Sequence, residues 1–240
     1  MKIELRKFYR FAIAAETCLV MQSIKLTMNK ELKLAIFDLG QVCIRTHLER
    51  CYLDWEDMAG IRPGSVSRDF PFDDQYEDYE RGTISGRSYA EYFCMVNGLA
   101  LDFEQWKSGW NAIFGTPIEP TMQTAREMRE AGVTVVAMSN TNATHTEYLQ
   151  NNYKDLVDSF DHRYFSNEIG MRKPEPRVFE FILDQRQCDP SEVVFFDDLE
   201  ENIYAAQRLG IESVLFDDDS KAMLWWKRRQ AAACESAAVN

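Results

Sequence analysis

The stretch "LKLAIFDLG", residues 32–40, decides the fold, because an apolar run stops abruptly at Asp38. Three later segments share this design: "VTVVAM" ends at Ser139, "EVVFF" ends at Asp197, and "ESVLF" runs into Asp217. Short runs of Val, Ile and Phe without strict alternation are typical of strands buried on both faces, as in parallel sheets covered by helices. We therefore predict such a sheet, with polar side chains at its strand ends.

The segments between these runs have the apolar spacing of amphipathic helices, in residues 119–132, 175–187 and 200–210. The first of them has Pro120 near its start and Gly132 at its end, which is typical of helix boundaries. Strand and helix alternate along the chain, so the predicted fold class is α/β, with a Rossmann-like core.

Residues 45–117 differ from the rest, because aromatic and acidic residues are closely mixed there, as in "FPFDDQYEDYERGTISGRSYAEYF". This pattern predicts a small helical cap inserted after the first strand. We expect five segments: an N-terminal extension, read as floppy or as an upstream start, at 1–30; a core at 31–44 and 118–220; the cap at 45–117; and a C-terminal tail at 221–240.

Composition excludes several function classes. The 240-residue chain is 45% hydrophobic and has a net charge of -12, which argues against broad nucleic-acid or anionic-membrane surfaces. Six cysteines lie apart, without a Cys-x-x-Cys pair, so we expect reduced thiols rather than disulfides or a zinc site. No apolar run approaches the ~18 residues of a membrane span. We expect a cytoplasmic protein.

The strand ends predict where a ligand binds. In an open parallel sheet, ligands lie outside the carboxyl ends of the strands, so Asp38, Ser139 and the pair Asp197–Asp198 should meet in one crevice.

Four stretches, "FDLGQV", "MSNTN", "GMRKPEP" and "FFDDLEEN", occur in this order. On these residues the chain resembles the haloacid dehalogenase-like hydrolase superfamily from about residue 32 to residue 217. It is most similar to the bacterial sugar-phosphatase group typified by alpha-D-glucose-1-phosphate phosphatase. The resemblance implies a Mg²⁺-dependent phosphatase acting on a small phosphomonoester, such as glucose 1-phosphate, beneath a closing cap.

The resemblance also implies roles for individual residues. Asp38 is the implied nucleophile that forms an aspartyl phosphate, and a carboxylate suits this role because it is ionised at neutral pH. The implied Mg²⁺ site consists of Asp38, the backbone carbonyl of Gly40, Asp197 and Asp198, all hard oxygen donors.

Four further positions complete the implied site. The hydroxyl of Ser139 and the backbone N–H of Asn140 would hold the phosphate where the next helix begins. Lys173 would bring its charge to the phosphate and to Asp38. Asn202 would orient the metal ligands.

Gly40 departs from the usual pattern of the superfamily, in which an aspartate at this position acts as general acid and base. A missing acid/base commonly costs ~10²–10⁴-fold in rate. The glucose-1-phosphatase group shares this glycine, which favours an active enzyme. Three alternatives stay open: a weak or inactive protein that binds a phosphorylated metabolite or a partner, a 2-haloacid dehalogenase, and a phosphomutase.

Overall fold

The computed structural model describes residues 31–238, so the predicted N-terminal extension at 1–30 lies outside the described residues. Its centre is a five-stranded sheet in the order β5-β4-β1-β6-β7, and the paired strands are parallel. The strands are β1 (Leu34–Phe37), β4 (Thr134–Ser139), β5 (His162–Phe165), β6 (Val193–Asp197) and β7 (Glu212–Leu215). The predicted α/β class with a parallel sheet is confirmed.

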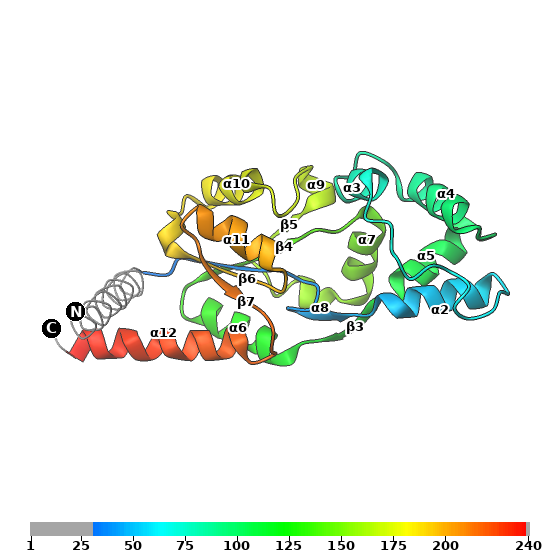
Figure 1. Ribbon diagram of the computed structural model, residues 1–240. Helices are drawn as coiled ribbons and strands as arrows, with labels where there is room; N and C mark the ends of the chain where they lie inside the picture. Colours follow the sequence, from blue (N-terminus) through cyan, green and yellow to red (C-terminus); the bar gives the residue numbers. More distant parts are fainter. Residues whose placement is uncertain (1–30, 239–240) are drawn as a thin grey trace, which may run out of the picture.

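Helices cover both faces of this sheet (Figure 1). Leu34 and Ile36 of β1 pack on one face with α10 (Pro176–Arg186) and α11 (Glu200–Arg208). Ala35 and Phe37 point to the other face, towards α6 (Glu119–Glu130) and α12 (Lys221–Ala238). Successive strand side chains alternate between faces, so all four β1 residues are fully buried and the strand needs no polar alternation.

Short elements connect the strands on the β4 side. The chain passes from β4 through α7 (Ala143–Asn152) and α8 (Lys154–Val157) into β5, and from β5 through α9 (Ser166–Ile169) into α10. A 3₁₀ turn at Pro190–Glu192 precedes β6.

A second group of helices lies at one end of the molecule, on the right in Figure 1. Two short antiparallel strands, β2 (Ile44–Thr46) and β3 (Phe114–Pro117), join it to the core. Its helices are α2 (Leu48–Met58), α3 (Asp74–Glu80), α4 (Gly86–Asn97) and α5 (Phe103–Asn111). We call residues 44–117 the cap. The expected helical insertion is present, and the two framing strands are additional features.

The cap has a hydrophobic core of its own. Trp55, Trp106 and Trp110 are at most 2% exposed, and Tyr79, Tyr89 and Phe93 pack with them. The aromatic residues that stand out in the sequence therefore form the cap interior, with ring pairs such as Trp55–Trp106 stacked at 6.2 Å. Aromatic side chains contribute much of the buried area in so small a unit.

The segment expected to be a C-terminal tail is helical through Ala238 and is part of the core at its start. Ala222 is fully buried and Trp226 is 5% exposed, both in the cluster that includes α6. The indole N–H of Trp225 donates to Glu212 of β7 at 2.8 Å. The end of this segment is rich in alanine, which predicts a tail, and this composition gives no sign of the buried residues at its start. No helix among residues 31–238 combines the length and apolarity needed to cross a bilayer.

Candidate active site

The strand order brings the predicted residues together. Strand β1 lies between β4 and β6, and the register pairs Phe37 with Ala137 on one side and with Phe196 on the other. Asp38 therefore follows β1 beside Asp197, and its backbone N–H donates to the Phe196 carbonyl at 2.9 Å. Ser139 ends the strand on the other flank. Parallel pairing alone places these polar groups on one edge of the sheet.

Lys173 links two of the strand ends. Its ammonium donates to Asp38 Oδ1 and to Asp197 Oδ2, each at 2.6 Å, and the lysine is 2% exposed. Burial disfavours the charged lysine, but the carboxylates of Asp197 and Asp38 outweigh this effect and raise the pKa of Lys173 above its usual range. A buried cation held by two carboxylates is fixed in position, whereas removal of one partner would leave a buried charge unpaired.

The side chain of Asn140 holds the backbone of Lys173. Its Oδ1 accepts the Lys173 N–H at 2.8 Å, and its Nδ2 donates to the Lys173 carbonyl at 2.9 Å. The motif resemblance implies a role only for the backbone N–H of Asn140. The side-chain role has no signal in the sequence beyond an amide that follows a strand end, because its partner is 33 residues away.

Several hydrogen bonds fix the loop after β4. Thr141 N–H donates to Ser166 Oγ at 2.8 Å, so this amide already has a partner. The side chain of Asn142 accepts the His145 N–H and caps α7. Ser139, 8% exposed, lies at the start of this loop with its hydroxyl beside the Asn140 carbonyl.

The carboxyl groups of Asp38, Asp197 and Asp198 lie close enough to interact electrostatically. Burial, together with the charge of the neighbouring Asp197, raises the pKa of Asp38 to about 7, against the lowering effect of Lys173. Burial and the charge of Asp197 also raise the pKa of Asp198. Because these shifts come from burial and mutual repulsion, a cation next to Asp38 and Asp198 would stabilise both carboxylates.

Asp197, predicted as a metal ligand, accepts three hydrogen bonds within the protein. One of its oxygens accepts from Lys173, and the other accepts the Leu199 N–H and the Asn202 Nδ2, both at 2.9 Å. Asp197 is fully buried and these donors contact both of its oxygens, so it positions Lys173 and Asn202. Within residues 31–238 there is no group of three or more His, Cys, Asp or Glu side chains arranged for a metal.

The remaining donors still fit Mg²⁺. Asp38, Asp198 and the carbonyl of Gly40 would supply two carboxylates and one backbone oxygen, a set that Mg²⁺ completes with water. The side-chain oxygen of Asn202 is buried without a hydrogen-bond partner, and such an acceptor suits a metal-bound water.

Gly40 is not required by the local backbone or by packing. A Cβ there would meet its nearest atoms, Thr46 Cγ2 and Asp38 Oδ2, at 3.8 and 3.9 Å, which is ordinary contact. The glycine therefore leaves space beside the Asp38 carboxylate that a larger side chain could occupy.

A cavity of about 530 Å³ opens from Asp38 towards the cap. Ser139, Asn140, Lys173 and Asn202 line it beside the strand ends, and Phe72, Tyr76, Trp110, Ile113 and Phe114 line it from the cap. Arg45 and His47, which lie just after the first strand, are not part of this lining. Arg45 forms an ion pair with Asp219 instead.

Ion pairs connect cap helix α3 to the residues on either side of Lys173. Arg172 pairs with Glu77 at 2.7 Å and with Glu80 at 2.9 Å, and Arg81 of the cap pairs with Glu175. Burial raises the pKa of Glu80, against the lowering effect of Arg172. The lysine loop and the cap are thus joined next to the cavity.

His145, to which sequence analysis assigned no role, is also at the junction of cap and core. Its ring stacks on Trp110 at 4.5 Å, its Nε2 bonds the Trp110 carbonyl at 3.1 Å, and its Nδ1 bonds Asn142 Nδ2 at 3.2 Å. Asn142 donates through its amide nitrogen, so Nε2 carries the proton and the ring is neutral. Burial lowers the pKa of His145 to about 3.

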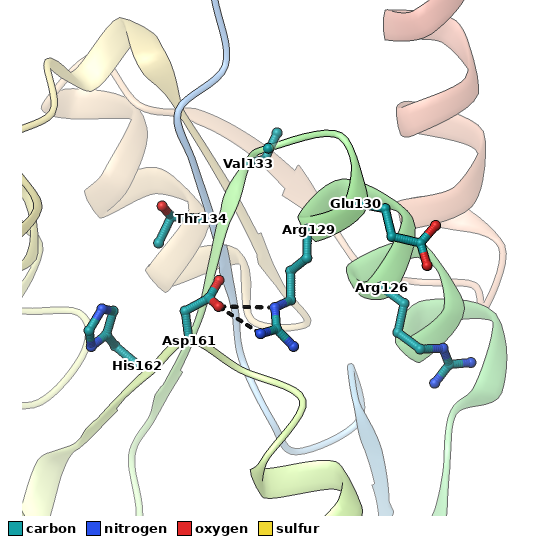
Figure 2. Close-up of a pocket in the computed structure, with 8 residues that line it drawn as sticks. Arg126, Arg129, Glu130, Val133, Thr134, Asp161 and His162 are labelled. Carbon is teal, nitrogen blue, oxygen red and sulfur yellow. Dashed lines mark hydrogen bonds and ion pairs between the residues drawn. The ribbon is translucent and has the colours of Figure 1, made fainter.

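A second hollow, of about 650 Å³, lies at the opposite end of the strands (Figure 2). It surrounds Thr134 at the start of β4, roughly 16 Å from Ser139 at the usual rise per strand residue. Its most prominent charges, Arg129 and Asp161, point towards each other and are paired at 2.8 Å. We assign the chemistry to the cavity beside Asp38, where the strand ends and buried charges converge.

Comparisons with known proteins agree with this geometry. The family model for haloacid dehalogenase-like hydrolases matches residues 107–210. A sesquiterpene phosphatase of Aspergillus oryzae is 32% identical over 205 residues, which cover 84% of this chain and 97% of that protein. A D-ribitol-5-phosphate phosphatase of Bacteroides thetaiotaomicron is 26% identical over 193 residues, covering 76% and 90%.

A solved structure has the same architecture. A haloacid dehalogenase-family enzyme of Bacteroides thetaiotaomicron, crystallised with magnesium and inorganic phosphate, superposes with a TM-score of 0.67 at 27% identity and covers 77% of this chain and 93% of that one. Other relatives are longer: the chain spans only 19% of the bifunctional epoxide hydrolase 2 of rat.

Proposed function

Since the chain belongs to the haloacid dehalogenase-like hydrolase family, we propose that it is a Mg²⁺-dependent phosphomonoesterase that acts through an aspartyl phosphate on Asp38. One observation carries this proposal: Lys173 bridges Asp38 and Asp197 at the floor of a cavity that Ser139 also lines. The phosphatase relatives and the magnesium-containing structure support it.

The chemistry follows from the two oxygens of Asp38. Lys173 holds Oδ1, while Oδ2 lies on the side of Gly40, where a Cβ would be 3.9 Å away. Oδ2 attacks phosphorus, a P–O bond to the carboxylate forms, and the bond to the leaving alkoxide breaks. Water then attacks the aspartyl phosphate, which releases inorganic phosphate and restores the carboxylate.

The surrounding residues have distinct tasks. The hydroxyl of Ser139 and the N–H of Asn140 bind phosphoryl oxygens, and Lys173 offsets their charge and orients the nucleophile. Mg²⁺ held by Asp38, Asp198 and the Gly40 carbonyl would reduce the repulsion between the anionic nucleophile and the anionic ester. Asp197 and Asn202 keep this arrangement in place.

The cap, at residues 44–117 in the structure and 45–117 in the sequence prediction, covers the cavity and separates the reacting groups from bulk solvent. The ion pairs of Arg172 and Arg81 hold it against the lysine loop. An enclosed site favours a small phosphorylated molecule, and the net charge of -12 favours neither nucleic acid nor an anionic membrane. A cytoplasmic location remains a prediction from the sequence.

Two substrate classes are supported by different observations. A sugar phosphate such as glucose 1-phosphate follows from the motif resemblance, and the ribitol-phosphate relative supports a polyol. The sesquiterpene phosphatase relative supports an apolar ester. Glucose 1-phosphate would depend less on a general acid, which Gly40 does not supply, because an anomeric oxygen leaves as a weaker base than an ordinary alkoxide.

The test is phosphate release from glucose 1-phosphate, glucose 6-phosphate, ribitol 5-phosphate and farnesyl monophosphate, with and without Mg²⁺. We expect metal-dependent turnover that Asp38→Asn abolishes. No release above the Asp38→Asn background from folded, Mg²⁺-replete protein would refute the phosphatase and favour a phosphometabolite-binding protein. Release of halide from a 2-haloacid without Mg²⁺ would instead favour a dehalogenase.

A further inference from the structure

The cavity beside Asp38 has two halves of different chemistry. The half at the strand ends is polar and suits a phosphate. The other half is lined mainly by hydrocarbon, from Leu39, Phe72, Trp110, Ile113, Phe114 and Leu199. A volume of about 530 Å³ is within the range of small-molecule sites, so the outer half has room for a leaving group.

Most polar side chains of the outer half are engaged with one another. Arg172 donates to Glu80 from Nε at 3.0 Å and pairs with Glu77 at 2.7 Å. Burial raises the pKa of Glu80, and the side chain of Tyr76 lies close enough to this carboxyl group to oppose that shift. These groups already have partners within the protein, and a sugar hydroxyl that displaced one of these partners would give little net stabilisation.

His145 is engaged in the same way. Both ring nitrogens have partners, the Trp110 carbonyl and Asn142, and the ring face is covered by Trp110. Of the polar residues that line the outer half within the described chain, Thr46 and Glu201 remain. A sugar has several hydroxyls, each of which needs a partner when it leaves water, so two side chains are too few.

Two exposed apolar side chains belong to this lining, one from each part of the molecule. Phe72 of the cap is 72% exposed, and Leu199, which follows β6 in the core, is 49% exposed. A hydrocarbon ligand in the outer half would cover both and remove their apolar surface from water.

We propose that the substrate is a phosphate monoester of an apolar, hydrocarbon-rich alcohol rather than of a sugar, an inference that rests on the proposed function of this site. The alkoxide leaves from the polar half, while the hydrocarbon packs between Phe72, Phe114 and Leu199. Gly40 provides no acid, so aryl esters react faster than alkyl esters of the same size, because a phenolate is the better leaving group.

The test uses a matched pair of esters. Cyclohexylmethyl phosphate and glucose 6-phosphate both carry a six-membered ring and a primary alkoxide leaving group, and they differ in the ring hydroxyls and ring oxygen. We expect kcat/KM of the wild-type enzyme with Mg²⁺ to be at least about tenfold higher for cyclohexylmethyl phosphate, mainly through KM, as partial burial of a hydrocarbon ring predicts.

Phe72→Ser tests the pocket itself. This side chain is already exposed, so the variant should fold, and we expect the preference for cyclohexylmethyl phosphate to fall roughly tenfold. Met95→Ser is the control, because Met95 is 73% exposed on the cap but does not line the cavity. Equal effects of Phe72→Ser on both esters, or a wild-type preference for glucose 6-phosphate, would overturn the proposal.

Acetyl phosphate and calorimetry separate this proposal from the proposed function. Hydrolysis of acetyl phosphate and glucose 6-phosphate, but not of cyclohexylmethyl phosphate, overturns the apolar substrate alone. No hydrolysis of any ester refutes the phosphatase, and calorimetric binding of both ring esters to Asp38→Asn then decides whether the cavity prefers hydrocarbon. Tighter binding of cyclohexylmethyl phosphate supports the proposal, and equal or weaker binding overturns it.

Discussion

Replacement of Gly40 by aspartate should increase the rate of phosphate transfer. The structure accommodates the new side chain, because its Cβ would meet no atom closer than Thr46 Cγ2 at 3.8 Å. The new Cβ would lie 3.9 Å from the attacking Asp38 Oδ2, so the carboxyl group would be close to the phosphoryl group and its leaving oxygen. Neighbouring carboxylates raise the pKa of an added acid, so a proton would be available for the leaving oxygen.

The size of the gain follows from general acid catalysis. A positioned acid or base typically contributes about 10²–10⁴-fold, or about 3–5 kcal/mol of activation free energy. We expect the lower end of this range, about 10²-fold in kcat, because the residues around Asp38 and Lys173 do not hold the new carboxyl group in a fixed position. The gain should apply to alkyl esters, whose alkoxides need a proton, and should be small for 4-nitrophenyl phosphate.

The assay compares single-turnover rates of wild type, Gly40→Asp and Gly40→Asn on cyclohexylmethyl phosphate and 4-nitrophenyl phosphate at saturating Mg²⁺. Asparagine has nearly the same shape and cannot transfer the proton, so it separates chemistry from packing. Equal rates for the Asp and Asn variants, or a gain independent of the leaving group, would refute the idea that this site lacks its acid.

Three further outcomes follow from the structure. Asn140→Ala should lower kcat by about 10-fold or more with little change in stability, because the Lys173 loop loses two hydrogen bonds; unchanged kinetics would contradict this positioning role. His145 is neutral when folded, with its pKa lowered to about 3, so the unfolded chain binds more protons between that value and about 6.5 and stability must fall as the pH falls. Denaturant unfolding should show that from pH 7 to pH 5 the wild type loses about 2 kcal/mol of stability relative to His145→Gln, and identical pH slopes of the two proteins would rule this out. Trp226→Ala should lower the free energy of unfolding by about 3–5 kcal/mol, measured by urea denaturation, whereas a change below about 1 kcal/mol would mean that α12 is dispensable.

Local pattern was enough to predict the sheet and its ligand edge. Asp38, Ser139 and Asp197 each end an apolar run that is too short and too β-rich for a helix, and parallel pairing has only one edge for such ends. Strand β5, "HRYF", escaped this reasoning because it is an edge strand whose first two residues are exposed.

The family motifs predicted the identity of Lys173, but only the tertiary structure decided what the residues around it do. Asp197 holds the Lys173 ammonium, Asn140 holds the Lys173 backbone, and His145 joins cap to core. These contacts connect residues 24 to 35 positions apart. Hydrophobic periodicity indicates which residues of one helix or strand are buried, whereas contacts between elements depend on how helices and strands pack. A single sequence could therefore predict the reacting groups. It could not predict the shape and polarity of the cavity that selects the substrate.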